Sequence, residues 1–111
     1  MVETVTTQEL SDLLSGTDID VVDVRDEREW LTGHVPGSRN IPLETLRSDP
    51  DAYLARDKPI VFICARGVRS LTAAKLAERL GYSTIYNLDG GTSAWSRSGL
   101  QLSVEAIATA A

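Results

Sequence analysis

Short apolar runs alternate along this chain with segments in which apolar residues recur every three or four positions. The clearest run is Ile-Val-Phe-Ile at 60–63, a continuous β-branched and aromatic stretch typical of a central parallel strand covered on both faces. A second strand is expected at 19–24. Weaker strands are expected at 40–42, which a proline ends, and at 83–86.

Two segments carry strong helix signals. Thr6 followed three residues later by Glu9 is a capping box, which predicts a helix that begins there and ends near Gly16. The apolar spacing over 70–80 is helical, and Gly81 follows where a left-handed C-terminal cap belongs. Each helix adjoins one of the two clear strands in sequence, and this alternation predicts an α/β domain.

Shorter helices are expected elsewhere in the chain. Asp26 with Glu29 three residues later repeats the N-terminal cap signal, so a short helix should end before Gly33 and lead into a turn at 34–38. The remaining expected elements are small helices at 43–46 and 51–54, a turn at 87–91, and a last helix that carries Trp95 and runs to Gly99.

The composition fits one globular domain. The chain has 111 residues, of which 42% are hydrophobic and 24% charged, a balance that excludes disordered and fibrous classes. A single Cys excludes an intramolecular disulfide, and one Cys with one His provides too few ligands for a tetrahedral zinc site. The net charge of −5 argues against a nucleic-acid partner, because such binding needs many phosphate-neutralising cations.

No segment indicates export or a membrane. The N-terminus has neither a basic leader nor an apolar run, and no stretch approaches the length of a membrane span. We therefore expect a cytoplasmic protein without membrane contacts. Residues 103–111 are small and helix-tolerant, so we expect the domain to cover 1–102 and the tail to form a short helix or a frayed end.

The candidate chemistry lies in the segment Cys-Ala-Arg-Gly-Val-Arg-Ser, here called the Cys64 loop (residues 64–70), between a buried strand and a helix. Such loops bind ligands in open α/β sheets, and their backbone N–H groups, with those of the helix N-terminus, form a cradle for an anion. A thiolate is itself an anion, so the cradle should lower the pKa of Cys64, and the guanidinium groups of Arg66 and Arg69 should act the same way. Gly67 lets the backbone turn.

Positive charge is concentrated around the Cys64 loop. Residues 60–80 hold four basic residues and one acidic residue, a local charge of +3 that leaves −8 for the rest of the chain. This distribution favours a small anionic substrate and disfavours polyanions. A lone Cys after an apolar strand is most often a buried, inert residue, but the flanking loop favours a reactive role for Cys64.

Other candidate residues have two interpretations each. His34 could serve Cys64 as a general base, although a histidine in a Gly-His-x-Pro-Gly turn more often fixes the turn through hydrogen bonds. Trp30 and Trp95 are expected to be packing anchors, with lining of the site entrance as the alternative.

Asp23 and Arg25 lie at the end of the strand expected at 19–24, Arg25 one residue beyond it. Both could face the cleft at that edge of the sheet. An ion pair or a turn brace with Glu29 is the favoured interpretation.

Cys-x-x-Gly-x-Arg-Ser after an apolar strand resembles the active-site loop of the rhodanese family of sulfurtransferases. Three further segments, in the right order over 23–99, are similar to signatures of that family. They are Asp-Val-Arg at 23–25 with Glu29 and Trp30, Gly-His-Val-Pro-Gly-Ser at 33–38 with Asn-Ile-Pro at 40–42, and Leu-Asp-Gly-Gly at 88–91 with Trp95 and Gly99. Leu-Gln-Leu at 100–102 departs from the proline that many relatives carry there, which bears on the path of the tail.

The resemblance implies a single rhodanese-like domain with a five-stranded parallel sheet and helices on both faces. It implies that Cys64 is catalytic: its thiolate takes the outer sulfur of thiosulfate, releases sulfite and becomes a persulfide, which cyanide, a cellular thiol or a dithiol protein then discharges. No cofactor or metal is implied. The substrate-binding residues would be Ala65, Arg66, Gly67, Val68, Arg69 and Ser70. Contact with the donor is favoured for Arg66, whereas Arg69 could equally brace the loop through backbone carbonyls.

Two alternatives to a thiosulfate sulfurtransferase are considered. A rhodanese-like module could instead relay sulfur between proteins or bind a partner, with little thiosulfate turnover of its own. Phosphatases of related shape have one residue more than the four between Cys64 and Arg69, so the shorter loop disfavours phosphate and arsenate. An arsenate reductase would also need a resolving thiol, and the chain has no second Cys.

Overall fold

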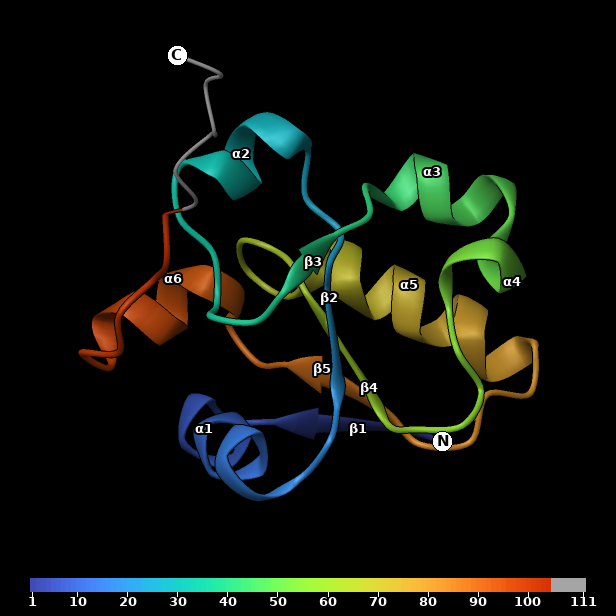
Figure 1. Ribbon diagram of the computed structural model, residues 1–111, viewed down its shortest axis with the longest axis horizontal. Helices are drawn as coiled ribbons and strands as arrows, with labels where there is room; N and C mark the ends of the chain where they lie inside the picture. The colour runs from blue at the N-terminus through green and yellow to red at the C-terminus, as the bar shows by residue number, and fades with distance from the viewer. Residues whose placement is uncertain (105–111) are drawn as a thin grey trace, which may run out of the picture.

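Five parallel strands form one sheet in the computed structural model, which describes residues 1–104. In spatial order the strands are β1 (Val2–Val5), β5 (Ile85–Leu88), β4 (Ile60–Ile63), β2 (Asp20–Asp23) and β3 (Arg39–Asn40) (Figure 1). Because β4 is the middle strand, its carboxyl end lies at the centre of one edge of the sheet. This arrangement confirms the α/β class and the five-stranded parallel sheet.

Helices cover both faces of the sheet. They are α1 (Thr7–Gly16), α2 (Glu27–Leu31), α3 (Leu43–Ser48), α4 (Pro50–Tyr53), α5 (Val68–Arg79) and α6 (Gly91–Arg97). Figure 1 shows α3, α4 and α5 on one side of the sheet and α1 and α6 on the other. The short helix α2 follows the carboxyl end of β2 and so lies at the same edge as the end of β4.

The alternation of side chains along β4 divides the core into two layers. Ile60 and Phe62 pack in the cluster that contains the small residues of α5, which are Ala73, Ala74 and Ala77. Val61 and Ile63 point the other way, into the cluster formed with Leu10 and Trp95. All four β4 residues are buried, which explains why the run is continuously apolar.

The predicted start of α1 is confirmed in detail. The Glu9 N–H donates to Thr6 Oγ1 over 3.1 Å, and the Thr6 N–H donates to Glu9 Oε1 over 2.9 Å. These reciprocal bonds satisfy backbone donors that the first turn of a helix leaves unpaired. The helix ends at Gly16, as expected.

Several elements differ from the expectations. Strand β3 covers Arg39–Asn40 instead of 40–42, α3 and α4 cover 43–48 and 50–53 instead of 43–46 and 51–54, and α6 ends at Arg97 instead of Gly99. Strand β1 has no counterpart among the expected strands, because it is an edge strand in which only Val5 is buried and its apolar pattern is weak. Strand β5 covers Ile85–Leu88 instead of 83–86, so Asn87 and Leu88, expected in a turn, are strand residues. Helix α5 begins at Val68, two residues early.

The chain returns to the domain after α6. Leu100 and Leu102 pack against the cluster that contains Trp95. Ser103 then forms an antiparallel bridge with His34, with N–H to carbonyl bonds of 2.7 and 3.0 Å. Residues 105–111, most of the expected tail, lie outside the described residues. Within residues 1–104, no helix is both long enough and apolar enough to span a bilayer.

Candidate active site

The Cys64 loop joins the end of β4 to the start of α5. Cys64 is 1% exposed and directly follows the last residue of the strand. Gly67, the N-cap of α5, has a φ of +99°, which few residues other than glycine adopt. The loop therefore reverses over three residues and brings the first N–H groups of α5 back toward the sulfur.

Hydrogen-bond donors converge on Cys64 Sγ. The Gly67 N–H lies 3.0 Å from the sulfur, and the Ser70 hydroxyl lies 3.3 Å from it. Burial raises the pKa of the thiol, but bonds from the Ser70 hydroxyl and from the backbone N–H groups of Ser70, Arg66 and Gly67 outweigh burial and lower the pKa below its ordinary value. Arg66 thus acts on the sulfur through its backbone, whereas Arg69 adds electrostatic attraction.

Backbone hydrogen bonds join the start of helix α6 to the Cys64 loop. The N–H groups of Thr92 and Ser93 donate to the carbonyls of Cys64 and Ala65 over 2.9 and 3.1 Å. The backbones approach so closely that a Cβ on Gly91 would lie 2.2 Å from the Cys64 carbonyl oxygen. The start of α6, together with Gly91 of the Leu-Asp-Gly-Gly segment, therefore fixes the main chain of Cys64.

Asn87 is a member of the site that the sequence interpretation missed. Its Oδ1 accepts from Ser70 Oγ over 2.5 Å, and its Nδ2 donates to the Gly67 carbonyl over 3.3 Å. The residue is 5% exposed and sits in β5, the neighbour of β4. A polar residue one position from the end of a buried strand was the available signal, but the Asn-Leu-Asp-Gly run favoured a turn there.

The two arginines of the loop are used differently. Arg69 binds Glu29 of α2 through two bonds of 2.8 and 3.0 Å, and these bonds lower the pKa of Glu29 to about 2. Its partner is thus a carboxylate and not the backbone carbonyls that were considered. The Arg66 side chain is exposed and makes no hydrogen bond or ion pair within residues 1–104. Val68, the next residue after Gly67, is 75% exposed.

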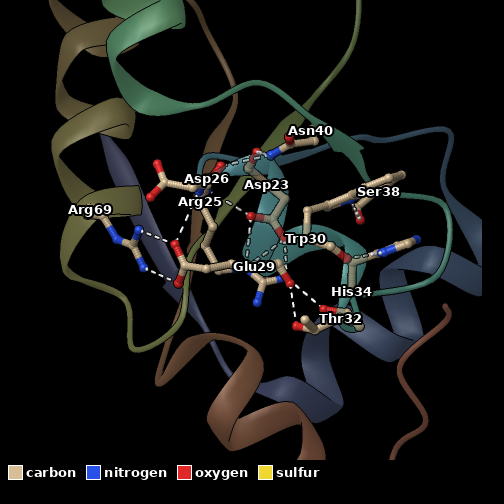
Figure 2. A network of polar contacts seen from close by, with 11 residues as sticks. Asp23, Arg25, Asp26, Glu29, Trp30, Thr32, His34, Ser38, Asn40 and Arg69 are labelled. Atoms are coloured by element: carbon tan, nitrogen blue, oxygen red, sulfur yellow. Dashed lines mark hydrogen bonds and ion pairs between the residues drawn. The ribbon is translucent and has the colours of Figure 1, made fainter. Parts of the chain in front are cut away.

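Asp23 and Arg25 form a buried ion pair with each other (Figure 2). Arg25 Nε and Nη2 donate to the Asp23 carboxylate over 3.0 and 2.8 Å, and Nη2 also donates to the Gly33 carbonyl over 2.7 Å. The expected ion pair is therefore present, but Glu29 is not its member, because Glu29 binds Arg69. The pair anchors the turn after α2 to the end of β2.

His34 packs inside that turn (Figure 2). Its ring stacks on Trp30 with centroids 3.8 Å apart, and its Nδ1 donates to the Trp30 carbonyl over 2.8 Å. Trp30 Nε1 in turn donates to Ser38 Oγ over 3.2 Å. These contacts support the turn-fixing role of His34 over the general-base role. Trp95 is a packing anchor, 4% exposed, with its Nε1 bonded to the Gln101 carbonyl.

Comparison with known families adds a decisive observation. The family of the Rhodanese-like domain matches residues 6–98, which include the whole Cys64 loop and Asn87. This chain belongs to the rhodanese-like domain family. Across the part of this rhodanese-like domain that the structure describes, no three His, Cys, Asp or Glu side chains are grouped as metal ligands.

Relatives of this rhodanese-like domain include named sulfurtransferases. The thiosulfate sulfurtransferase GlpE of Shewanella oneidensis is 32% identical over 87 residues, which cover 78% of this chain and 85% of GlpE. The probable adenylyltransferase/sulfurtransferase MoeZ of Mycobacterium tuberculosis is 38% identical over 96 residues, 85% of this chain but only 24% of MoeZ. This chain therefore spans about a quarter of the length of MoeZ.

Solved structures give the same picture. The crystal structure of a rhodanese-related protein from Thermoplasma volcanium superposes with a TM-score of 0.83 at 30% identity. The match covers 93% of this chain and 99% of that one. The whole described fold is thus that of a rhodanese-like domain.

Proposed function

We propose that this protein is a sulfurtransferase that moves a sulfane sulfur from thiosulfate, or a similar small anionic donor, through a persulfide on Cys64 to a thiol or to cyanide. The observation that carries the proposal is the convergence of the Gly67 N–H and the Ser70 hydroxyl on Cys64 Sγ, at 3.0 and 3.3 Å. The relationship to GlpE supports thiosulfate as the donor. A reducing compartment such as the cytoplasm would keep the thiol available.

The cycle has two displacement steps. The Cys64 thiolate attacks the outer sulfur of thiosulfate, a new S–S bond forms, and the old S–S bond breaks with its electron pair leaving on sulfite. The terminal sulfur of the persulfide is anionic and is held by the N–H groups of the Cys64 loop. An acceptor nucleophile then attacks that sulfur, and the electron pair of the Cys64–sulfur bond returns to Sγ as a thiolate.

The donor's sulfonate end needs a cation, and Arg66 is available for it. Arg66 lies two residues after Cys64, and its exposed side chain makes no polar contact within the described chain, whereas Arg69 is held by Glu29. We assign Arg66 to donor binding and Arg69 to holding α2 against the loop. The net charge of −5 disfavours nucleic acids and anionic membranes as binding partners.

The test is the intact mass of the protein after thiosulfate and then after cyanide. We expect a gain of one sulfur atom that cyanide removes. The Cys64→Ser protein, which keeps the loop but lacks the nucleophile, should gain nothing. A folded wild-type protein that gains no sulfur from thiosulfate would refute the thiosulfate assignment.

A second candidate function, sulfur relay to a protein acceptor, is favoured by the outer surface of α5. Val68, Thr72, Lys75 and Arg79 are exposed and spaced four, three and four residues apart, so they form one stripe opposite the buried face of the helix. The stripe begins at the mouth of the loop with an apolar side chain and continues with two cations that form no ion pairs within residues 1–104. An acidic protein surface that presents a thiol would complement it.

Two model acceptors test the relay. Peptides with one Cys flanked by glutamates or by lysines are compared as acceptors for the loaded protein. Relay to an acidic partner requires faster transfer to the glutamate peptide and loss of that preference in Lys75→Glu/Arg79→Glu, with the cyanide rate unchanged. Equal rates for both peptides would exclude it.

A further inference from the structure

One hydroxyl proton in the site faces two acceptors. Ser70 Oγ lies 3.3 Å from Cys64 Sγ and 2.5 Å from Asn87 Oδ1, and all three residues are buried. A serine hydroxyl has a single hydrogen, so it donates to only one of these atoms at a time. The Cys64 sulfur and the Asn87 amide therefore compete for the Ser70 proton.

The orientation of the Asn87 amide is fixed at its other end. Nδ2 lies 3.3 Å from the Gly67 carbonyl oxygen, which can only accept, so the NH₂ group faces Gly67 and Oδ1 faces Ser70. Since Oδ1 also can only accept, Ser70 is the donor in that pair. When Cys64 carries its own proton, the S–H group can donate to Ser70 Oγ, and the three groups form a chain that ends at Asn87.

We propose that Asn87 is a positioning residue that holds the Ser70 proton while the Cys64 sulfur is uncharged and releases it when that sulfur becomes a thiolate. The use of this switch in turnover rests on the proposed function, but its geometry does not. Sγ is a thiolate before it attacks the donor, is uncharged in the persulfide, and becomes a thiolate again as the persulfide bond breaks. The hydroxyl therefore turns twice in each cycle, and no proton is gained or lost.

The competition also limits how strongly the thiolate is stabilised. When Ser70 donates to sulfur, Asn87 Oδ1 loses its donor, and a buried acceptor without a donor is unfavourable. This cost offsets part of the stabilisation that the Ser70 hydrogen bond gives the thiolate, so the pKa of Cys64 falls less. Because the nucleophilicity of a thiolate falls as its thiol becomes more acidic, the Cys64 thiolate keeps more of its nucleophilicity.

The charged groups near the Cys64 sulfur are the same whichever way the Ser70 hydroxyl points. Arg69 on α5 attracts Cys64 electrostatically. Arg69 is itself attracted by Glu29 in α2 and by Asp26, the residue before α2. Arg66 is the other cation of the loop. None of these side chains bonds to the side chain of Ser70 or Asn87 within residues 1–104. Substitutions at Ser70 and Asn87 therefore leave the charges in place.

A double-mutant cycle tests the switch through the pH dependence of Cys64 alkylation by iodoacetamide. Asn87→Leu removes the competing acceptor, so the Ser70 proton should stay on sulfur and the pKa of Cys64 should fall. We expect the thiolate fraction below the pKa to rise about fivefold, the effect of one ordinary hydrogen bond, and the alkylation rate there to rise about twofold, because each thiolate is then less nucleophilic. In the Ser70→Ala background the same substitution should give no such rise.

The outcomes separate the switch from a merely structural role. Equal changes in both backgrounds, or no change in either, would overturn the proposal, because Asn87 would then act without the Ser70 proton. If Asn87→Leu fails to fold, Asn87→Asp replaces it. A carboxylate should hold the Ser70 proton more firmly, so the pKa of Cys64 should rise more with Ser70 present than in the Ser70→Ala background, and equal rises would refute the switch. Alkylation needs no sulfur donor, so these results stand even if thiosulfate fails to load the protein.

Discussion

Two segments at the same edge of the sheet follow buried parallel strands, yet they use their polar groups in opposite ways. At the carboxyl end of β2, Asp23 and Arg25 are 0% and 5% exposed and bind each other, and Arg25 also donates to the Gly33 carbonyl. In the Cys64 loop after β4, the donors meet at one sulfur atom, and the Arg66 side chain has no partner in the described chain.

The comparison teaches which polar groups serve stability and which serve chemistry. Polar groups that satisfy one another inside the protein fix the fold, because separating them leaves a buried charge. Groups left available around a nucleophile cost some stability and can bind a ligand. Substitutions in the two segments should therefore separate stability from sulfur transfer.

The largest effect is expected from Arg25→Met. It leaves the fully buried Asp23 carboxylate without its cation, which should lower the free energy of unfolding by about 3–5 kcal/mol in urea. Lys58→Met is the matched control, because Lys58 pairs with the exposed Asp18 over 3.5 Å and should cost at most about 1 kcal/mol. Similar small losses of unfolding free energy in both variants would show that the buried pair stabilises the fold no more than the exposed pair does.

Gly91→Ala should come next, and it tests how firmly α6 holds the Cys64 loop. A Cβ there would lie 2.2 Å from the Cys64 carbonyl oxygen at a φ of +58°, so we expect a loss of about 3 kcal/mol in unfolding experiments and slower alkylation of Cys64. Gly37→Ala has a φ of +83° but no atom within 4 Å, and should cost about 1 kcal/mol. Equal losses would show that the close approach contributes nothing.

Arg66→Ala should change chemistry without changing stability. Loss of a charge-assisted bond to the donor should raise KM for thiosulfate about tenfold or more, with the free energy of unfolding within about 0.5 kcal/mol of wild type. Cys64 should still alkylate normally. Arg97→Ala, an exposed arginine of α6, is the control with unchanged KM. Unchanged KM in Arg66→Ala would assign the sulfonate to another group.

Glu29→Gln should have the smallest effect. The Arg69–Glu29 pair is more than a third exposed, so we expect a loss of at most about 1 kcal/mol at about pH 7. Because the pKa of Glu29 falls from 4.5 to about 2 on folding, the pair stabilises above the unfolded pKa, and this contribution fades as pH falls from 4.5 through about 2. Urea unfolding at about pH 7 and about pH 3 should show the gap between variant and wild type narrowing. An equal difference in unfolding free energy at the two pH values would contradict a stabilising Arg69–Glu29 ion pair.

The sequence predicts those features that depend on neighbours along the chain. The buried run of β4, the capping box of α1 and the Cys64 loop all follow from local patterns, and the structure has each of them. Strand β1 escapes prediction because its stability comes from pairing with β5, more than eighty residues away, and not from its own apolar pattern.

The uses of individual polar side chains were harder to predict. Arg69 meets Glu29 across 40 residues of sequence, and Asn87 meets Ser70 across 17. Which donor finds which acceptor depends on how the strands are ordered in the sheet, and spacing along the chain does not contain that order. The ion pair of Asp23 and Arg25, two residues apart, was within reach of local reasoning.

The bonds from Thr92 and Ser93 to the Cys64 loop have a consequence for the newly made protein. A nascent chain that has left the ribosome only as far as α5 contains Cys64 and its loop but lacks β5, Asn87 and the start of α6. Its sulfur then has neither the amide that competes for the Ser70 proton nor the clamp on its own backbone. We expect the thiol of such an unfinished domain to behave like an ordinary cysteine, so that the proposed sulfur chemistry begins only after β5 and the start of α6 have been made.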